Sequence, residues 1–378
     1  MGNIELNNHQ NNPRNSAIEL CRIIVMFMIV ASHFSAHSGF TFDKGVIDLS
    51  VLWYYVLDLG GQFGVDVFIL ISGYFLVQNT NLSVSVKKCL KLWGQVFFYS
   101  TSIFVIGITT GICKYSHTQL INALLPIISK AWWFATTYFV LFLLHPYLNR
   151  LLHNISKRQY QNFLLLLFFI WCIIPTFTSF SLASNELVDF FFFYVIAGYI
   201  RLHGSSIKLN SKHFFLLWLL ATLVTYSSGI ILTLLGKNIN LFAEHANYFY
   251  HRKTLPTLFR AVFFFMIFER MTIKPSKIIN TISKAAFGVY LIHDSNIIRP
   301  WLWKSLFVGR QYQDSYLLVP YSIIVALIVY TVCTLIDLTR IYTVEALFSK
   351  CIDKYCDKLL FLPKKLIEYT RKHIFGKE

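Results

Sequence analysis

The chain has 378 residues, of which 56% are hydrophobic, 17% aromatic and 14% charged. A soluble globular domain carries about 25% charged residues, and one water-soluble core of this size cannot hide 36 phenylalanines that occur in long apolar blocks. Because lipid tails solvate such side chains directly, the composition excludes a soluble domain and predicts an integral membrane protein.

The formal net charge of +16 does not indicate nucleic-acid binding. Lys and Arg cluster in short loops between apolar blocks and in the last forty residues, where anionic lipid headgroups lie. No basic stripe interleaves with aromatic residues that could stack on bases. We therefore expect membrane lipid, and no nucleic acid, as a partner.

Apolar blocks long enough to cross a bilayer recur along the whole chain. A hydrocarbon core of about 30 Å needs roughly 20 apolar residues per helix, and such blocks predict an all-α bundle of about ten membrane-spanning helices. The expected spans are 17–36, 59–78, 92–112, 132–152, 162–180, 187–203, 213–235, 255–271, 284–302 and 317–339.

These spans divide the chain into a polar cytoplasmic N-terminus (1–16), a membrane domain (17–340) and a basic amphipathic cytoplasmic tail (341–378). The first part lacks the pattern of a cleavable signal, so we expect none. We also expect two interfacial helices: the apolar run 51–57 on the outer side, and the tail, which mixes basic residues with Leu, Phe and Tyr.

Alternate loops differ in basic residues, which predicts the orientation. The richer set comprises Lys87, Lys88, Lys91, Arg150, Lys157, Arg158, Arg201, Lys208, Lys212, Arg270, Lys274, Lys277 and the tail. By the positive-inside rule both termini are cytoplasmic, as an even number of spans requires. We expect a multi-pass protein of the cell membrane, and no internal repeat of the kind that marks many transporters is visible.

The first span carries charged and titratable residues, which are costly inside a membrane and usually serve function. Arg22 and His33 are eleven residues apart, so they share one helical face about 16 Å apart along the axis. Glu19 can neutralise Arg22 from three residues before it. His33 lies deep enough to act as a general base or proton shuttle. Two alternatives stay open: Arg22 extends its charged end to the membrane interface, or His33 is only a hydrogen-bonded residue of the core.

In the second span, Asp66 is expected at the depth of His33, where a carboxylate could hold the imidazole in one tautomer. Ser72, followed by Gly73, is interpreted first as a close-packing notch between helices. His37 follows His33 at metal-ligand spacing but has no third ligand, and the seven cysteines show no metal spacing. We therefore expect no metal site.

Further polar residues occur in the later spans. Lys88 and Lys91 share one cytoplasmic face and are either ordinary positive-inside charge or a phosphate clamp. Trp132, Trp133 and Tyr138 first indicate an interfacial aromatic belt. The ninth span adds Tyr290 and a second mid-membrane histidine, His293, followed by Asp294. No P-loop, dinucleotide-binding glycine pattern or HExxH sequence occurs.

The sequence resembles the acyltransferase-3 family of integral membrane O-acyltransferases. The family's opening helix has an acidic residue, an Arg and a His, which match Glu19, Arg22 and His33 here. Its GVDxFFxxSG-like run matches Gly64 to Tyr74, its FGxYLxH signature matches Phe287 to His293, and the stretch from Trp133 to Asn149 resembles its fourth helix. These landmarks occur in family order between positions 17 and about 340.

The resemblance implies an enzyme that moves an acyl group, usually acetyl from acetyl-CoA, to a hydroxyl of a surface or exported polysaccharide or glycolipid. It implies His33 as the essential residue and Arg22, beside Glu19, as a donor-binding residue. Asp66 is the partner that depth counting predicts for His33. Lys88 and Lys91 stand where the family often has arginines, so they would bind the donor without a bidentate fork. Ser72, Tyr138, Tyr290 and His293 are candidates for acceptor binding or for supporting His33.

The donor is expected as a co-substrate, with no bound cofactor, and transfer is expected within the membrane domain, since no esterase-like domain follows it. A non-catalytic transporter or flippase of glycolipid intermediates is the alternative, because it would also use buried ionisable residues. The acyl chain, the acceptor sugar, the choice between direct transfer and an acyl-enzyme, and the oligomeric state stay open.

Overall fold

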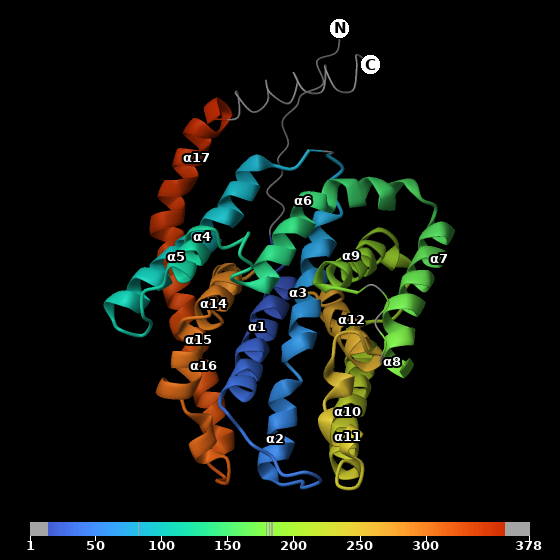
Figure 1. Cartoon of the computed structure of the whole chain (residues 1–378). Helices are drawn as coiled ribbons and strands as arrows, with labels where there is room; N and C mark the ends of the chain where they lie inside the picture. Colours follow the sequence, from blue (N-terminus) through green and yellow to red (C-terminus); the bar gives the residue numbers. More distant parts are fainter. Residues whose placement is uncertain (1–13, 82, 179, 181, 183, 360–378) are drawn as a thin grey trace.

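The computed structural model describes residues 14–81, 83–178, 180, 182 and 184–359, and this part of the chain is helical with no strand. The all-α expectation is thus confirmed (Figure 1). The α-helices are α1 Ser16–His37, α2 Leu49–Asp58, α3 Gly61–Leu76, α4 Val86–Thr109, α5 His117–Leu124, α6 Trp133–Asn154, α7 Lys157–Phe168, α8 Ile174–Thr178, α9 Glu186–His203, α10 Ser211–Leu235, α11 Asn240–Glu244, α12 Leu255–Glu269, α13 Lys277–Ile282, α14 Ala286–His293, α15 Ile298–Trp301, α16 Leu318–Arg340 and α17 Ala346–Leu359.

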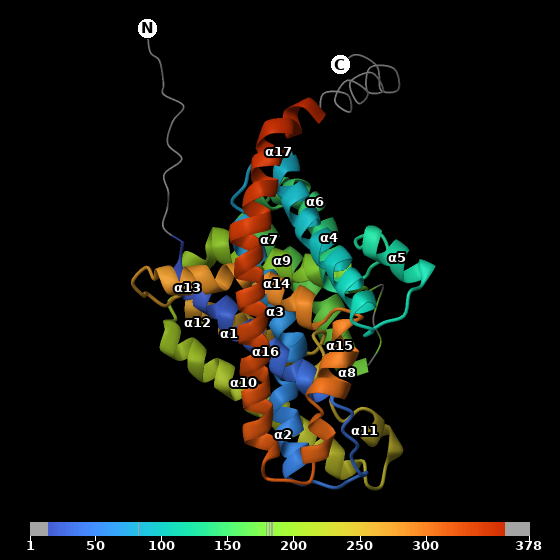
Figure 2. The same cartoon turned by 90° about the vertical axis from the view of Figure 1, so that its left-hand side faces the viewer.

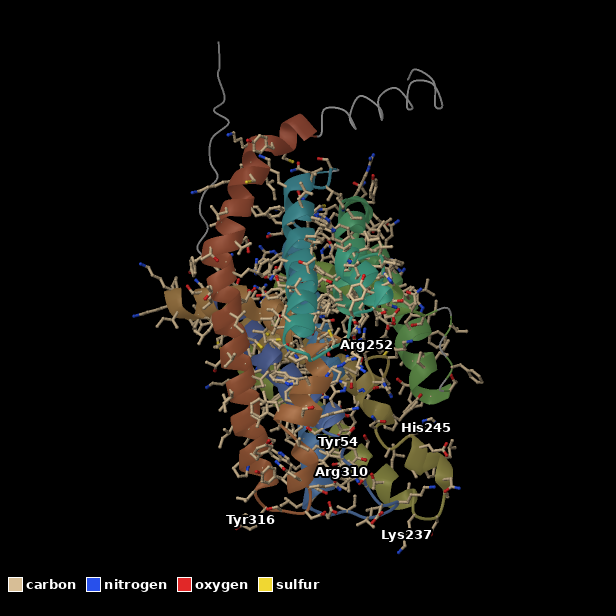
Figure 3. All side chains as sticks on the ribbon, turned by 60° about the vertical axis from the view of Figure 1, so that its left-hand side comes forward. Tyr54, Lys237, His245, Arg252, Arg310 and Tyr316 are labelled. Atoms are coloured by element: carbon tan, nitrogen blue, oxygen red, sulfur yellow. The ribbon has the colours of Figure 1, made fainter. Side chains whose placement is uncertain are left out.

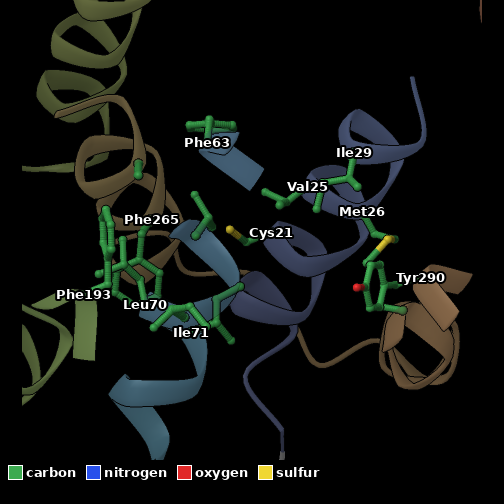
Figure 4. Close-up of a cluster of buried hydrophobic side chains, with 14 of the residues drawn as sticks. Cys21, Val25, Met26, Ile29, Phe63, Leu70, Ile71, Phe193, Phe265 and Tyr290 are labelled. Carbon is green, nitrogen blue, oxygen red and sulfur yellow. The ribbon is translucent and has the colours of Figure 1, made fainter. Parts of the chain in front are cut away.

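Helix α1 lies at the centre of the bundle. It packs against α2, α3, α12, α13, α14 and α16, and 61% of its most apolar stretch is buried, against 11% for α10 at the periphery. Lipid can solvate the apolar side chains of α10, whereas those of α1 need protein neighbours. Figure 4 shows the shared core, whose labelled residues are Cys21, Val25, Met26, Ile29, Phe63, Leu70, Ile71, Phe193, Phe265 and Tyr290.

Seven helices of the described chain are long and apolar enough to cross a membrane, and they coincide with seven of the ten predicted spans. They are Ser16–His37, Leu49–Leu76, Val86–Thr109, Lys157–Thr178, Glu186–Ser206, Ser211–Leu235 and Leu318–Cys356.

The other three predicted spans are helical but do not meet these criteria. Helix α6 has 22 residues, yet polar groups such as Asn149 and Arg150 lower the hydropathy of its last turns. Helix α12 has 15 residues, which extend only about 22 Å. The ninth segment breaks after His293, because the polar residues Asp294 to Asn296 separate α14 from α15.

The run 51–57, expected as a separate interfacial helix, is instead the lower half of a rod. Helices α2 and α3 stack end to end (Figures 1 and 2), and together they form the single candidate span Leu49–Leu76. Gly60 lies at the junction, where a Cβ atom would overlap the backbone of Met28 on α1. The close approach of α1 therefore requires glycine there.

The axis of α16 also continues beyond position 340. A π-helical turn, Ile341–Glu345, connects α16 to α17, and Figure 2 shows the two helices as one long rod. Helix α17 packs on α4, where Lys87 Nζ lies 3.3 Å from Asp353 Oδ1. The expected boundary at 340/341 is thus no break in the helix, while most of the polar N-terminus (1–13) and the end of the tail (360–378) lie outside the described residues.

The two ends of the bundle differ. Helix α17 and the first turns of α4 lie at one end, which we call the α17 end (Figures 1 and 2). Lys237, Arg310 and Tyr316 lie toward the opposite end, together with α11, which we call the α11 end (Figure 3).

Candidate functional site

A large cavity opens beside Arg22. Its volume is about 520 Å³, and four basic residues from three parts of the chain line it: Arg14 and Arg22 at the start of α1, Lys284 just before α14, and Arg340 at the end of α16. Gln95, Ser72 and Tyr138 add polar groups to the wall. We call it the basic cavity.

Two of these cations are held by carboxylates. Arg22 Nη1 donates to Glu19 Oε2 at 2.6 Å, the i,i+3 pair expected from the sequence. Arg340 Nε donates to buried Asp337 at 2.6 Å, and its Nη1 donates to Glu345 at 2.9 Å. These bonds fix the positions of the guanidinium groups, which suits them to bind an anion with defined geometry.

Lys88 and Lys91 do not line the basic cavity. The side chain of Lys88 is exposed on the first turn of α4. Lys91 lines an adjoining groove between α4 and α17, which shares Gln95, Arg340 and Glu345 with the basic cavity. The cations that line the basic cavity beside Arg14 and Arg22 are Lys284 and Arg340, and the residue of α4 that reaches the cavity is Gln95.

A second, smaller cavity adjoins the first. It has a volume of about 40 Å³ and contains His33, Tyr290 and Asp294 in its lining, beside Met26 and Trp133. The lining that it shares with the basic cavity is formed by Phe68, Phe134 and Phe287. The two cavities thus meet at three aromatic rings, and we call the smaller one the histidine cavity.

A hydrogen-bond chain determines which nitrogen of His33 is basic. His293 Nδ1 lies 2.6 Å from the carbonyl oxygen of Val289, which can only accept, so Nδ1 carries the proton. In the neutral ring the Nε2 of His293 then has the lone pair, and it accepts from His33 Nδ1 at 2.9 Å. The remaining nitrogen of His33, Nε2, therefore holds a free lone pair, and it has no hydrogen-bond partner among the described residues.

The carboxylate beside His33 is Asp294. Its Oδ1 lies 3.6 Å from His33 Nδ1 and accepts a hydrogen bond from Arg299 at 3.1 Å. A carboxylate at this distance stabilises the ring when it gains a proton. Since α14 ends at His293, Asp294 begins the next turn and faces α1.

Asp66 was expected in that role and does not take it. Asp66 is 1% exposed and lies 4.0 Å from Arg252 Nε, and no ion pair in the described chain joins it to His33. The guanidinium of Arg252, labelled in Figure 3, stacks over the ring of Trp133 with 4.9 Å to the centroid. Equal depth in the membrane did not imply contact, because Asp66 faces α9 and the loop before α12 while His33 faces α14.

The other expected site residues divide between the two cavities. Ser72 and Tyr138 line the basic cavity, Tyr290 lines the histidine cavity, and His293 is completely buried behind His33. Within the described residues no group of three or more His, Cys, Asp or Glu side chains could hold a metal ion.

Four residues of the site were missed as site residues, although each had a signal. Asp294 directly follows His293, and Arg340 follows Asp337 at the same spacing as Arg22 follows Glu19. Lys284 precedes Phe287 by one helical turn, and Arg14 immediately precedes the first span. What connects them is the convergence of α1, α14 and α16, which no single motif contains.

Comparison with known families identifies the family of the chain. A family model described as "Acyltransferase domain" matches residues 15–338, which include the whole of α1 to α15 and all residues that line the histidine cavity. They also include the lining of the basic cavity except Arg14, Arg340, Ile341 and Glu345. Searches of curated proteins and of solved structures find no significant match. The chain therefore belongs to the acyltransferase-3 family and is a multi-pass membrane acyltransferase.

Proposed function

We propose that the protein transfers an acetyl group from acetyl-CoA to a hydroxyl of a cell-surface or exported polysaccharide or glycolipid, with His33 as the general base. The observation that carries this proposal is the hydrogen-bond chain that leaves Nε2 of His33 unprotonated at a cavity joined to a basic one. A base needs that free lone pair to remove the proton of an acceptor hydroxyl.

The basic cavity suits the donor's charged part. CoA carries phosphates, and Arg and Lys are the side chains that bind phosphate best. Arg14, Arg22, Lys284 and Arg340 face one volume of about 520 Å³. Arg22 and His33 are separated by about 16 Å along α1, since each of the eleven residues adds about 1.5 Å. An extended pantetheine arm spans a distance of that order, so a donor with its phosphates at Arg22 can present its thioester to His33.

The histidine cavity suits a short acyl chain. Its volume of about 40 Å³ corresponds to room for about three water molecules, and an acetyl group has three non-hydrogen atoms. Met26, Val65 and Phe287 close it with apolar side chains. A longer chain would have to displace these residues, at a cost typical of overpacked interiors.

In the proposed reaction, the acceptor oxygen attacks the thioester carbon as its proton passes to His33 Nε2. The Nδ1–H of His33 keeps its hydrogen bond to His293 Nε2, and Asp294 stabilises the positively charged ring of His33. The collapse of the tetrahedral intermediate forms the ester and expels the CoA thiolate, which takes the proton back from His33. A positioned base of this kind contributes about 10²- to 10⁴-fold in rate.

The proposal includes the orientation of the bundle in the membrane. With the α17 end in the cytoplasm, the basic cavity receives acyl-CoA from the compartment that contains it, and the acceptor approaches from the α11 end. Both termini are then cytoplasmic, as the distribution of Lys and Arg predicts.

The test is acetyl transfer by the purified protein in lipid nanodiscs, with radiolabelled acetyl-CoA as donor and de-acetylated surface polysaccharide or glycolipid as acceptor. His33→Gln keeps a polar side chain and removes the base, and we expect at least a 100-fold loss of transfer. His37→Gln, one helical turn away, is the matched control and is expected to keep most activity. In cells, base-labile acetyl signals in the NMR spectrum of the polysaccharide should disappear with His33→Gln only. Full transfer by His33→Gln, or none by the wild type, contradicts the proposal.

A further inference from the structure

The hydroxyl of Tyr290 is buried without a partner. Tyr290 is 7% exposed, and its oxygen makes no hydrogen bond in the described structure. The ring extends from α14 toward α1, where it lies beside Met26 (Figure 4). Both residues line the histidine cavity. A buried hydroxyl without a hydrogen-bond partner destabilises the fold by about 1–3 kcal/mol. Its presence at this cavity therefore points to a ligand atom that accepts its hydrogen bond.

The N-terminus of α6 meets the same cavity. Its N-cap residue, Trp132, offers no side-chain hydrogen bond, so the N–H groups of the first turn are not capped. The first two helical residues, Trp133 and Phe134, line the histidine cavity, and their N–H groups belong to this uncapped turn. A helix of 22 residues also directs the positive end of its dipole toward this point.

Around the histidine cavity, the hydroxyl of Tyr290 and the amide of Phe134 are donors, while the charged groups are already engaged. Asp294 accepts from Arg299 and faces His33, and the Nδ1 of His33 donates to His293. Two uncommitted donors beside a base are the arrangement that stabilises an oxygen on which negative charge develops. The ligand atom that fits is the carbonyl oxygen of a thioester.

We propose that Tyr290 Oη–H and the Phe134 N–H form an oxyanion site for the tetrahedral intermediate of acyl transfer. The inference rests on the proposed function and assigns Tyr290 a catalytic role. As the acceptor oxygen bonds to the carbonyl carbon, its proton moves to His33 Nε2 and the C=O π pair moves to the carbonyl oxygen. That oxygen accepts hydrogen bonds from the two donors. When the C–S bond breaks, the pair returns to the carbonyl and the thiolate takes the proton from His33.

The test is Tyr290→Phe, which removes the hydroxyl and keeps the ring that packs against Phe134 and Phe287. We expect kcat to fall about 10²- to 10³-fold, as for the loss of one oxyanion donor. The KM for acetyl-CoA should stay within about twofold, because the hydroxyl acts in the transition state and not on the bound ground state.

Tyr330→Phe is the matched control. Its hydroxyl is also buried without a hydrogen bond, but it lies on α16 against Phe27 and lines neither cavity. It should therefore keep the wild-type kcat, and the two variants should have similar thermal stability in detergent.

The outcomes separate this inference from the proposed function. Wild-type transfer together with its loss in His33→Gln supports the function. If Tyr290→Phe then keeps kcat within threefold of wild type, the oxyanion site is wrong and the function stands. A higher KM with unchanged kcat also overturns it, since that result indicates a role in donor binding. If the wild type transfers no acetyl group, the function itself is wrong and the oxyanion site has no reaction to serve.

Discussion

At the scale of single residues, a backbone carbonyl determines which nitrogen of His33 is basic. In a serine hydrolase triad the carboxylate fixes the tautomer of the histidine, and replacing that Asp by Asn costs about 10⁴-fold because the ring adopts the wrong tautomer. Here Val289 fixes His293, and His293 fixes His33. Asp294 stands 3.6 Å from the ring, so its contribution is charge and not tautomer selection.

This difference predicts a moderate effect for Asp294→Asn. We expect kcat to fall about 10- to 100-fold, which corresponds to a loss of about 1.4–2.7 kcal/mol in the stabilisation of the protonated ring by the nearby negative charge. Part of that loss comes from Arg299, whose cation is left beside His33 when Asp294 loses its charge.

The double variant Asp294→Asn, Arg299→Gln should therefore be more active than Asp294→Asn alone, as steady-state kinetics with acetyl-CoA will measure. A 10⁴-fold loss in Asp294→Asn, without recovery in the double variant, would mean that Asp294 selects the tautomer.

At the scale of elements, the contact between α14 and α16 connects the two cavities. Gly288 on α14 lies against buried Asp337 on α16, where a Cβ atom would overlap the carboxylate. Asp337 in turn accepts from Arg340 Nε at 2.6 Å and from the Tyr99 hydroxyl at 2.7 Å. The glycine of the FGxYLxH signature thus permits the close approach that holds Arg340 at the basic cavity.

Gly288→Ala should consequently weaken donor binding as well as stability. The added methyl group forces Asp337 away from Arg340, and we expect a loss of about 1–3 kcal/mol in stability, as for other overpacked sites. The KM for acetyl-CoA should rise more than kcat falls.

Gly204→Ala is the control for that variant. The nearest atom to its Cβ is 3.6 Å away, so thermal unfolding in detergent and KM should both match the wild type. An unchanged KM in a folded Gly288→Ala protein would show that Arg340 does not depend on this contact.

At the scale of the whole molecule, the distribution of charge predicts how the bundle sits in the membrane. Cys351 is exposed on α17, and Tyr316 is 79% exposed toward the opposite, α11 end. With the α17 end in the cytoplasm, a membrane-impermeant maleimide added to intact cells should label a Tyr316→Cys variant whose other cysteines are replaced. The same reagent should label a protein with Cys351 alone only after the membrane is opened. Labelling of Cys351 in intact cells would reverse the predicted orientation.

The membrane class, the helical architecture and the family could all be predicted from the sequence, because they depend on local patterns. Apolar blocks of about 20 residues identify spans, and spacing along a single helix places Arg22, Glu19 and His33 on one face. Seven of the ten predicted spans have the length and composition to cross a membrane. The three predicted spans that do not meet these criteria are the ones whose helices are short, polar or broken.

Contacts between helices were the part that the sequence did not determine. Depth counting placed Asp66 level with His33, but the rotation of each helix about its axis decides which residues touch, and α3 turns Asp66 toward Arg252. That Lys284 and Arg340, and not Lys88 and Lys91, line the basic cavity has the same cause, since a basic residue near the end of a helix can face a cavity or water. The sequence by itself thus determined the class of protein and the histidine of interest. Only the packing of α1 against α14 and α16 decided the partners of that histidine, because van der Waals contact between helices depends on all of their side chains at once.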